Sequence, residues 1–239
     1  MALESSTPSA RTDVDWARLG GILGIGWIVM FLLGAFLLQG DTPTRDDSVA
    51  DIRQYFVDDG DQYLFGDYLL GLAFMLFFLP FVIILRRVLA RTGGWAELLA
   101  RISFYAGLIA VVWGGIAGFF WGTLALGAAN AEVDDSSVRL LMEADAYAFA
   151  GLLLPIGLFM GAAGLSIWLS GALWRWLGII GIIGFLGAYI GAAWPIDGDE
   201  EGPLAAVGIV GFLGIMIFVL ITSINLLMRR DEIWDSNAG

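Results

Sequence analysis

Two acid–tyrosine pairs mark the positions at which this sequence could support chemistry inside a membrane. Asp67 and Tyr68 lie near the start of one long apolar run, and Asp145 and Tyr147 lie near the start of another. A carboxylate in the middle of a bilayer costs about 2.5–3.5 kcal/mol, and acids within membrane helices often mark ion or proton pathways. We therefore treat these four residues as candidate cavity residues. The alternative is that both acids lie at the wet edge of the membrane, or that Asp67 bonds to a tyrosine.

The residue types that are missing exclude several kinds of site. All twelve basic residues are arginine, and the chain contains no histidine and no cysteine. Haem with His or Cys ligands, an ordinary zinc site and a cysteine-held iron–sulfur cluster are therefore excluded. A Schiff base needs a lysine, and a catalytic triad needs a histidine. We expect no metal, no cofactor, no nucleic-acid partner and no identifiable catalytic residue.

The composition and its arrangement predict a polytopic membrane protein. Of the 239 residues, 59% are hydrophobic and 15% are charged, whereas ordinary soluble domains carry about 25% charged residues. A helix of about 17–25 apolar residues crosses the hydrocarbon core of a bilayer. Six runs have this length, so we predict an all-α fold with six transmembrane helices. The spans are expected at about residues 20–38, 64–85, 102–126, 146–169, 177–194 and 204–228.

The arginines are distributed unequally between the two sides that these spans define. Nine of the twelve lie on the side that holds both termini and the 86–101 turn, and three lie on the other side: Arg45, Arg53 and Arg139. Because cytoplasmic loops carry an excess of Lys and Arg, we expect both termini to be cytoplasmic. The domains are then a cytoplasmic tail at 1–18, a six-helix domain at 19–230 and a cytoplasmic tail at 231–239. The expected location is the cytoplasmic membrane of a prokaryote.

The loops expected on the outer side are acidic and contain helix-start signals. Ser48 and Asp51 resemble a capping box, which predicts a short amphipathic helix lying on the outer surface before the second span. A flexible acidic loop is the alternative. Ser136 or Ser137 is expected to cap a helix that continues into the fourth span, where Pro155 should cause a bend.

Small residues recur every four positions in the third span, and these are Ala106, Ala110, Gly114, Gly118 and Gly122. A face of this kind lets a neighbouring backbone approach closely. We therefore predict that the third helix packs through Gly114, Gly118 and Gly122. A substrate groove along the same face is the alternative.

Four short motifs carry a resemblance to a known family: IRQYF at 52–56, GDYL at 66–69, LRR at 85–87 and LWRWLG at 173–178. In this order they resemble a family of small integral membrane proteins, common in high-GC bacteria and described only as a domain of unknown function. The resemblance covers about residues 18–230 and implies the six-helix fold. That family has no settled activity, so the resemblance implies no substrate and no site residue.

The first functional hypothesis is a non-enzymatic scaffold, accessory or lipid- or partner-binding protein. Its expected partners are membrane lipids and either a helical membrane protein or a second copy of the chain. The second hypothesis is a small-solute or proton-coupled transporter that uses the outer-side carboxylates, and a membrane enzyme is the third. A deep polar cavity around Asp67, between the second and fourth spans, would favour transport, whereas a sealed, fully packed bundle with an exposed apolar face would favour partner binding.

Overall fold

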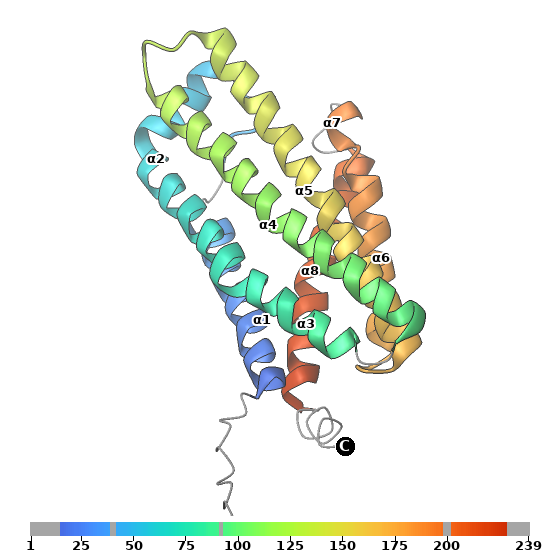
Figure 1. Ribbon diagram of the computed structural model, residues 1–239. Coiled ribbons are helices and arrows are strands. Elements are labelled where there is room, and N and C mark those ends of the chain that lie inside the picture. The colour runs from blue at the N-terminus through green and yellow to red at the C-terminus, as the bar shows by residue number, and fades with distance from the viewer. Residues whose placement is uncertain (1–14, 39–41, 91–92, 198–201, 229–239) are drawn as a thin grey trace, which may run out of the picture.

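The computed structural model describes residues 15–38, 42–90, 93–197 and 202–228, so both predicted tails lie wholly or mostly outside the described residues. The described chain is helical and contains no strand (Figure 1). Two segments, η1 and η2, have the wider π-helical turn. The elements in order are α1 (Trp16–Leu32), η1 (Leu33–Leu38), α2 (Val49–Leu72), η2 (Ala73–Phe78), α3 (Leu79–Leu89), α4 (Gly94–Ala129), α5 (Asp135–Ser170), α6 (Trp176–Gly191), α7 (Trp194–Asp197) and α8 (Pro203–Met228).

Six helical stretches are long and apolar enough to cross a membrane, which confirms the predicted all-α fold with six spans. They are Trp16–Ala35, Val49–Leu89, Gly94–Ala129, Asp135–Ser170, Trp176–Ile196 and Pro203–Met228. In the second stretch, α2, η2 and α3 follow one another without a break. The described chain starts and ends at the same end of the bundle, where α1 begins and α8 stops (Figure 1).

Three of these stretches are much longer than a bilayer requires. α4 and α5 have 36 residues each, and at 1.5 Å per residue each measures about 54 Å, against a hydrocarbon core of about 30 Å. The start of α2, the end of α4 and the start of α5 extend together beyond the other helices (Figure 1). A separate hydrophobic cluster joins them there, formed by Ile52, Phe56, Tyr63, Leu124, Ala125, Ala128, Val138 and Met142.

The predicted amphipathic helix on the outer surface is wrong, because residues 49–62 are the first turns of α2 itself. The predicted capping box is present, since the Asp51 N–H donates to Ser48 Oγ over 3.2 Å. Ile52 and Phe56, however, are buried in the cluster with α4 and α5 instead of resting on a membrane surface. Contacts between helices therefore make the acidic stretch, which was predicted to lie in the outer loop, a part of the second span's helix.

The cap of α5 is also different from the one that the sequence predicts. Asp134, and not Ser136 or Ser137, is the N-cap residue, and it accepts a hydrogen bond from the Ser137 N–H over 3.0 Å. Hydrogen bonds from the hydroxyl of Ser136 and from Ser137 lower the pKa of Asp134 to about 2. The helix continues through Pro155 to Ser170, and the predicted bend stays a prediction.

We call the end of the bundle where α4 meets α5 the acidic end. Two arginines there bind the α4–α5 turn and the segment before α2 through hydrogen bonds. Arg53 donates to the carbonyl oxygens of Ala128, Asn130 and Val133 and forms an ion pair with Asp135. Arg139 donates to two carbonyl oxygens of the segment before α2, those of Arg45 and Asp47.

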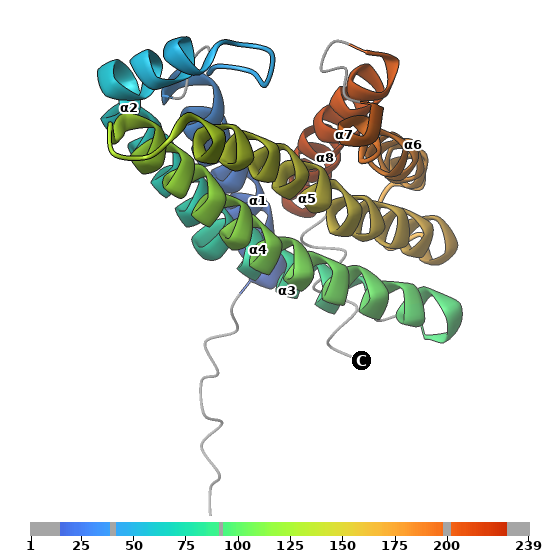
Figure 2. The ribbon, with the colours of Figure 1, turned by 90° about the horizontal axis from the view of Figure 1, so that it is seen from above.

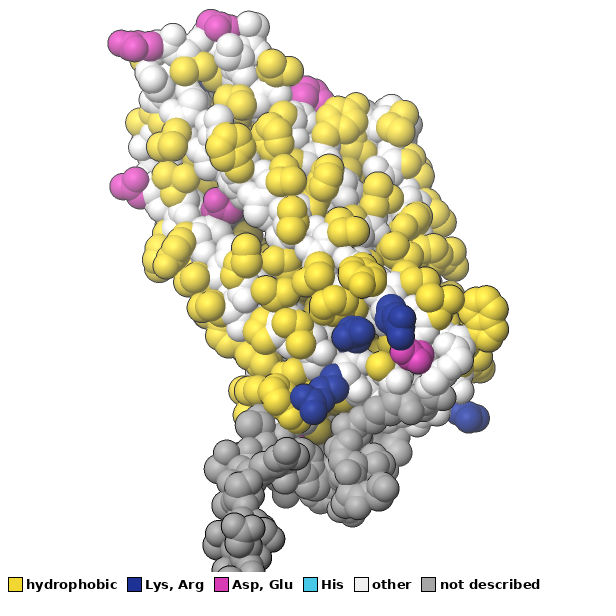
Figure 3. Space-filling view, in the orientation of Figure 1, with side chains coloured by type: hydrophobic (Ala, Val, Ile, Leu, Met, Phe, Trp, Pro, Cys, Tyr) yellow, Lys and Arg dark blue, Asp and Glu magenta, His cyan; other side chains and the backbone are white. Residues whose placement is uncertain are grey.

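Charge separates the two ends of the molecule. Asp and Glu side chains gather at the acidic end, and arginines gather at the opposite end (Figure 3). We call the latter the arginine end, and its described arginines are Arg18, Arg86, Arg87, Arg101 and Arg175. The surface between the two ends is apolar over most of the visible face (Figure 3).

The closest contacts between helix backbones lie between α5, α6 and α8, where the sequence analysis placed no packing face. A Cβ at Gly181 would lie 2.6 Å from the carbonyl oxygen of Met160, and a Cβ at Gly187 would lie 2.8 Å from the nitrogen of Gly211. At these glycines the backbone of α6 lies directly against the backbones of α5 and α8, and Figure 2 shows the three helices side by side.

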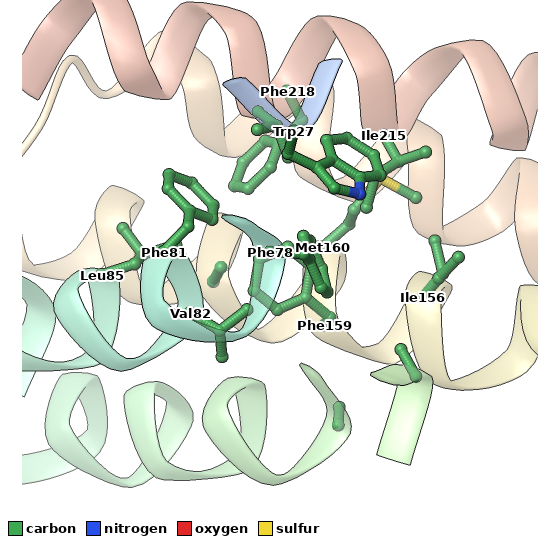
Figure 4. Packing of buried hydrophobic residues seen from close by; sticks show 14 of the residues in the cluster. Trp27, Phe78, Phe81, Val82, Leu85, Ile156, Phe159, Met160, Ile215 and Phe218 are labelled. Atoms are coloured by element: carbon green, nitrogen blue, oxygen red, sulfur yellow. The ribbon is translucent and has the colours of Figure 1, made fainter. Parts of the chain in front are cut away.

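Large side chains from α1, η2, α3, α5 and α8 fill the centre of the bundle. Trp27, Phe78, Phe81, Phe159 and Phe218 are all fully buried there (Figure 4). The ring of Phe78 contacts Trp27 at 5.0 Å and Phe159 at 5.3 Å between centroids. Trp27 belongs to this core and also lines the cavity described below.

Candidate functional site

A cavity of about 330 Å³ lies inside the bundle beside Asp67. Its lining comes from α1, α2, η2, α4, α5 and α8, and so it occupies the space between the second and fourth spans. We call it the Asp67 cavity. Its volume falls in the range of about 300–1,000 Å³ that is usual for small-molecule sites.

Aromatic rings form a continuous wall of the Asp67 cavity. Trp27 contacts Phe31 at 5.5 Å and Phe74 at 6.1 Å between ring centroids. Phe31 contacts Phe212 at 5.5 Å, and Phe212 contacts Phe149 at 6.2 Å. All five side chains line the cavity. This wall is suited to apolar groups, and a ring that turns its face to the cavity also attracts cations, because aromatic faces carry partial negative charge.

Asp67 is the one charged side chain among the described residues that line this cavity. The carboxylate is half-buried, and no described residue forms a hydrogen bond or an ion pair with it. Glycines on α4 make room for it, because a Cβ at Gly118 would lie 2.9 Å from Asp67 Oδ1 and one at Gly122 would lie 3.9 Å from Oδ2. The cavity thus presents an acceptor that its own walls do not use.

Trp27 also carries a polar atom without a partner, but this atom does not open into the cavity. The side chain is 1% exposed, and its indole Nε1 is fully buried and has no hydrogen-bond partner among the described residues. Figure 4 shows the ring packed among other buried side chains, with Ile215 beside it. A buried donor without a partner costs about 1–3 kcal/mol, so Trp27 contributes its ring to the cavity wall and its N–H lowers the stability of the fold.

The Asp67 cavity opens sideways between the second and third spans. Tyr68 and Met75 line it and yet are 60% and 53% exposed. Gly71 and Gly115 also line it, and a Cβ on either would meet no atom within 4 Å. We call this opening, framed by Tyr68, Gly71, Met75 and Gly115, the window.

Asp145 lies in a different cavity, which we call the vestibule. It has about 260 Å³ and is lined by Arg45, Tyr63, Asp145 and Trp194 among others, at the acidic end. Trp121 and Phe149 line both the vestibule and the Asp67 cavity, so they stand between the two. Tyr63 is buried and lines the vestibule together with Asp145. The two acids therefore do not share a cavity.

The remaining residues selected from the sequence are distributed unevenly. Tyr68 lies at the window, whereas Tyr147 is 54% exposed on α5 and lines neither the vestibule nor the Asp67 cavity. Gly114 faces the ring of Phe74, where a Cβ would make an ordinary contact of 3.4 Å. The small-residue face of α4 thus receives the side chains of α2 and η2, and not a neighbouring backbone.

Trp27 and the phenylalanine wall are the site residues that sequence reasoning missed. Single aromatic residues in apolar helices give no signal for a cavity, since most of them fill cores. Within the described ranges, no group of three or more His, Cys, Asp or Glu side chains could hold a metal ion. Comparison of the chain with protein-family models, curated proteins and solved structures finds no match.

Proposed function

We propose that this protein binds a small organic cation inside the membrane, with Asp67 as the counter-ion. The observation that carries the proposal is one carboxylate, without a partner among the described residues, in an aromatic-walled cavity. A compact ammonium group of an aromatic or aliphatic amine is the chemical class that suits this lining.

Two attractions favour such a ligand over a neutral one. An organic cation over a desolvated aromatic face gains about 2 kcal/mol or more. A carboxylate in a site of low dielectric constant adds a charge–charge attraction that is stronger than in water.

The Asp67 cavity is mostly apolar and so is not the polar cavity named as a mark of transport, but its one carboxylate favours the transporter hypothesis over the scaffold hypothesis. A scaffold or accessory protein needs packed helices and has no use for a half-buried acid, which is costly in a membrane. A carrier needs a site of this kind, and the vestibule beside it supplies a second acid nearer to the surface. We therefore propose that the protein is a small-solute transporter. Membrane lipids, a helical membrane protein or a second copy of the chain are proposed to contact its apolar surface.

The proposal predicts discrimination between two probes of the same shape. Phenyltrimethylammonium carries a charge, and tert-butylbenzene is its neutral isostere. We expect the purified protein in nanodiscs to bind the cation at least about tenfold more tightly, which corresponds to about 1.4 kcal/mol. Calorimetric titration with empty nanodiscs as the blank measures both. Equal affinities, or binding of neither probe, would contradict the proposed function.

We further propose that the acidic end faces outward from the cytoplasmic membrane of a prokaryote and that both termini are cytoplasmic. The support is the excess of arginines at the arginine end, since cytoplasmic loops are rich in Lys and Arg. The three described arginines of the acidic end are held by carboxylates and carbonyl oxygens of that end.

The absence of native cysteine makes this orientation directly testable. Ala131→Cys lies in the exposed turn between α4 and α5, and Ser170→Cys lies at the arginine end of α5. In intact cells, an impermeant thiol reagent is expected to modify Ala131→Cys and to leave Ser170→Cys unmodified until the membrane is broken. The reverse pattern would invert the topology.

A further inference from the structure

We infer that the ligand of the Asp67 cavity enters sideways from the lipid, through the window between α2–η2 and α4. This inference rests on the proposed function for the identity of the ligand, a membrane-dissolved organic cation. The inference rests on one observation: some residues that line the internal cavity, Tyr68 and Met75, are also exposed on the outer apolar surface of the bundle. Tyr68, Gly71 and Met75 lie on one helix at the spacing of a single face, and Gly115 lies opposite.

The two window glycines are not explained by helix packing. Glycine destabilises a helix relative to alanine, and in membranes it is usually retained where two backbones touch. Gly181 and Gly187 illustrate that use, whereas Gly71 and Gly115 would meet nothing within 4 Å if they carried a Cβ. Their lack of side chains keeps a passage to Asp67 clear, and Asp67 lies one turn before Gly71 on the same helix.

The route from water, through the vestibule, is more obstructed than the window. Trp121 and Phe149 separate the vestibule from the Asp67 cavity. Arg45 lines the vestibule, where its guanidinium forms an ion pair with Glu143 at 3.2 Å and lies 5.0 Å from the ring centre of Trp194. This side chain is only 9% exposed. Because Glu143 compensates the charge of Arg45, the obstacle to a cation coming from the vestibule is the pair of aromatic rings at Trp121 and Phe149.

A further groove lies between α5 and α8, and aromatic side chains separate it from the Asp67 cavity. Phe149 and Phe212 line both spaces, and their rings contact each other at 6.2 Å between centroids. Of these three routes among the described residues, the window is the one bordered by glycines with open space beside them, Gly71 and Gly115.

Modification of one buried cysteine tests the route without any cation. Ile156 lines the cavity and is 4% exposed, so Ile156→Cys places a thiol inside it; Leu152→Cys serves if that variant does not fold. We expect lipid-soluble N-phenylmaleimide to modify this cysteine in liposomes faster than an impermeant sulfonated methanethiosulfonate does. Adding Gly71→Leu and Gly115→Leu should slow the N-phenylmaleimide reaction by at least about tenfold, because packed side chains leave no room for the reagent.

Two matched changes serve as controls. Gly60→Leu adds the same side chain to α2 where a Cβ also meets nothing within 4 Å, outside the cavity lining, and should leave the rate unchanged. Trp121→Ala opens the wall toward the vestibule and should let the sulfonated reagent, which the parent protein excludes, reach the cysteine. The inference is overturned if the two leucines have no effect on the N-phenylmaleimide rate, or if the sulfonated reagent reacts as fast as N-phenylmaleimide in the parent protein.

The two proposals can fail separately. A parent protein that binds no phenyltrimethylammonium, yet loses labelling with the two leucines, refutes the ligand and keeps the route. A protein that binds the cation with unchanged labelling in the leucine variant keeps the ligand and refutes the route.

Discussion

Replacing Asp67 by asparagine is expected to weaken the binding of phenyltrimethylammonium by at least about 30-fold. Removing one partner of a desolvated charge pair costs about 2–5 kcal/mol, and each 1.4 kcal/mol is a factor of about ten. Asparagine keeps the shape of the side chain, so the room left by Gly118 and Gly122 stays filled as before. Binding of tert-butylbenzene, which has no charge, should be unchanged in the same titration.

Asp145→Asn is the matched control for that experiment. It removes the other acid that the sequence singles out, but Asp145 lines the vestibule and not the Asp67 cavity. We expect its affinity for phenyltrimethylammonium to stay within a small factor of the parent value. An equal loss in both variants would mean that general negative charge, and not the cavity, attracts the cation. No loss in Asp67→Asn would remove the counter-ion from the proposal.

Gly211→Ala is expected to destabilise the bundle strongly, although it adds only one methyl group. A Cβ at this position would lie 2.5 Å from the Cα of Ala188 on α6, and its closest neighbours are backbone atoms that cannot rotate away. The helices must separate, which costs about 1–3 kcal/mol or more in overpacked cores. Thermal or denaturant unfolding in detergent, followed by circular dichroism, should show a clearly lower midpoint.

Gly71→Ala provides the comparison for the same chemical change. Its Cβ enters open space, and alanine favours a helix over glycine by about 0.5–1 kcal/mol. The unfolding midpoint should therefore stay the same or rise. If both variants unfold at the same midpoint as the parent, α6 and α8 do not make the close backbone contact that we describe at Gly211.

The sequence predicts the spans well because length and apolar content decide whether a helix can cross a membrane. It predicts their ends poorly. Residues 49–62 have the charge of a loop, and they become part of α2 only because Ile52 and Phe56 are buried against α4 and α5. Likewise, Ser136 and Asp134 are both good caps, and the choice between them depends on the turn that Arg53 fixes.

Glycine spacing shows the same limit. The four-residue period on α4 correctly marks a face without large side chains, but it does not say whether backbone, side chains or empty space lies opposite. On α4 that face meets Phe74 and Asp67, whereas backbone contact occurs through Gly187 and Gly211. The Asp67 cavity needs six elements to be placed in three dimensions, so the sequence could name the acid but not the space beside it.

The acidic end has a consequence for the concentration of ions around the protein. Its helices carry Asp and Glu side chains well past the length that a bilayer covers, and arginines compensate only some of them. Such a surface holds a cloud of counter-ions, and organic cations compete for places in it with sodium and potassium. The cloud reaches about one Debye length, about 8 Å at physiological ionic strength. The acidic end thus raises the local concentration of organic cations near the protein, and added salt lowers that concentration because inorganic cations replace them.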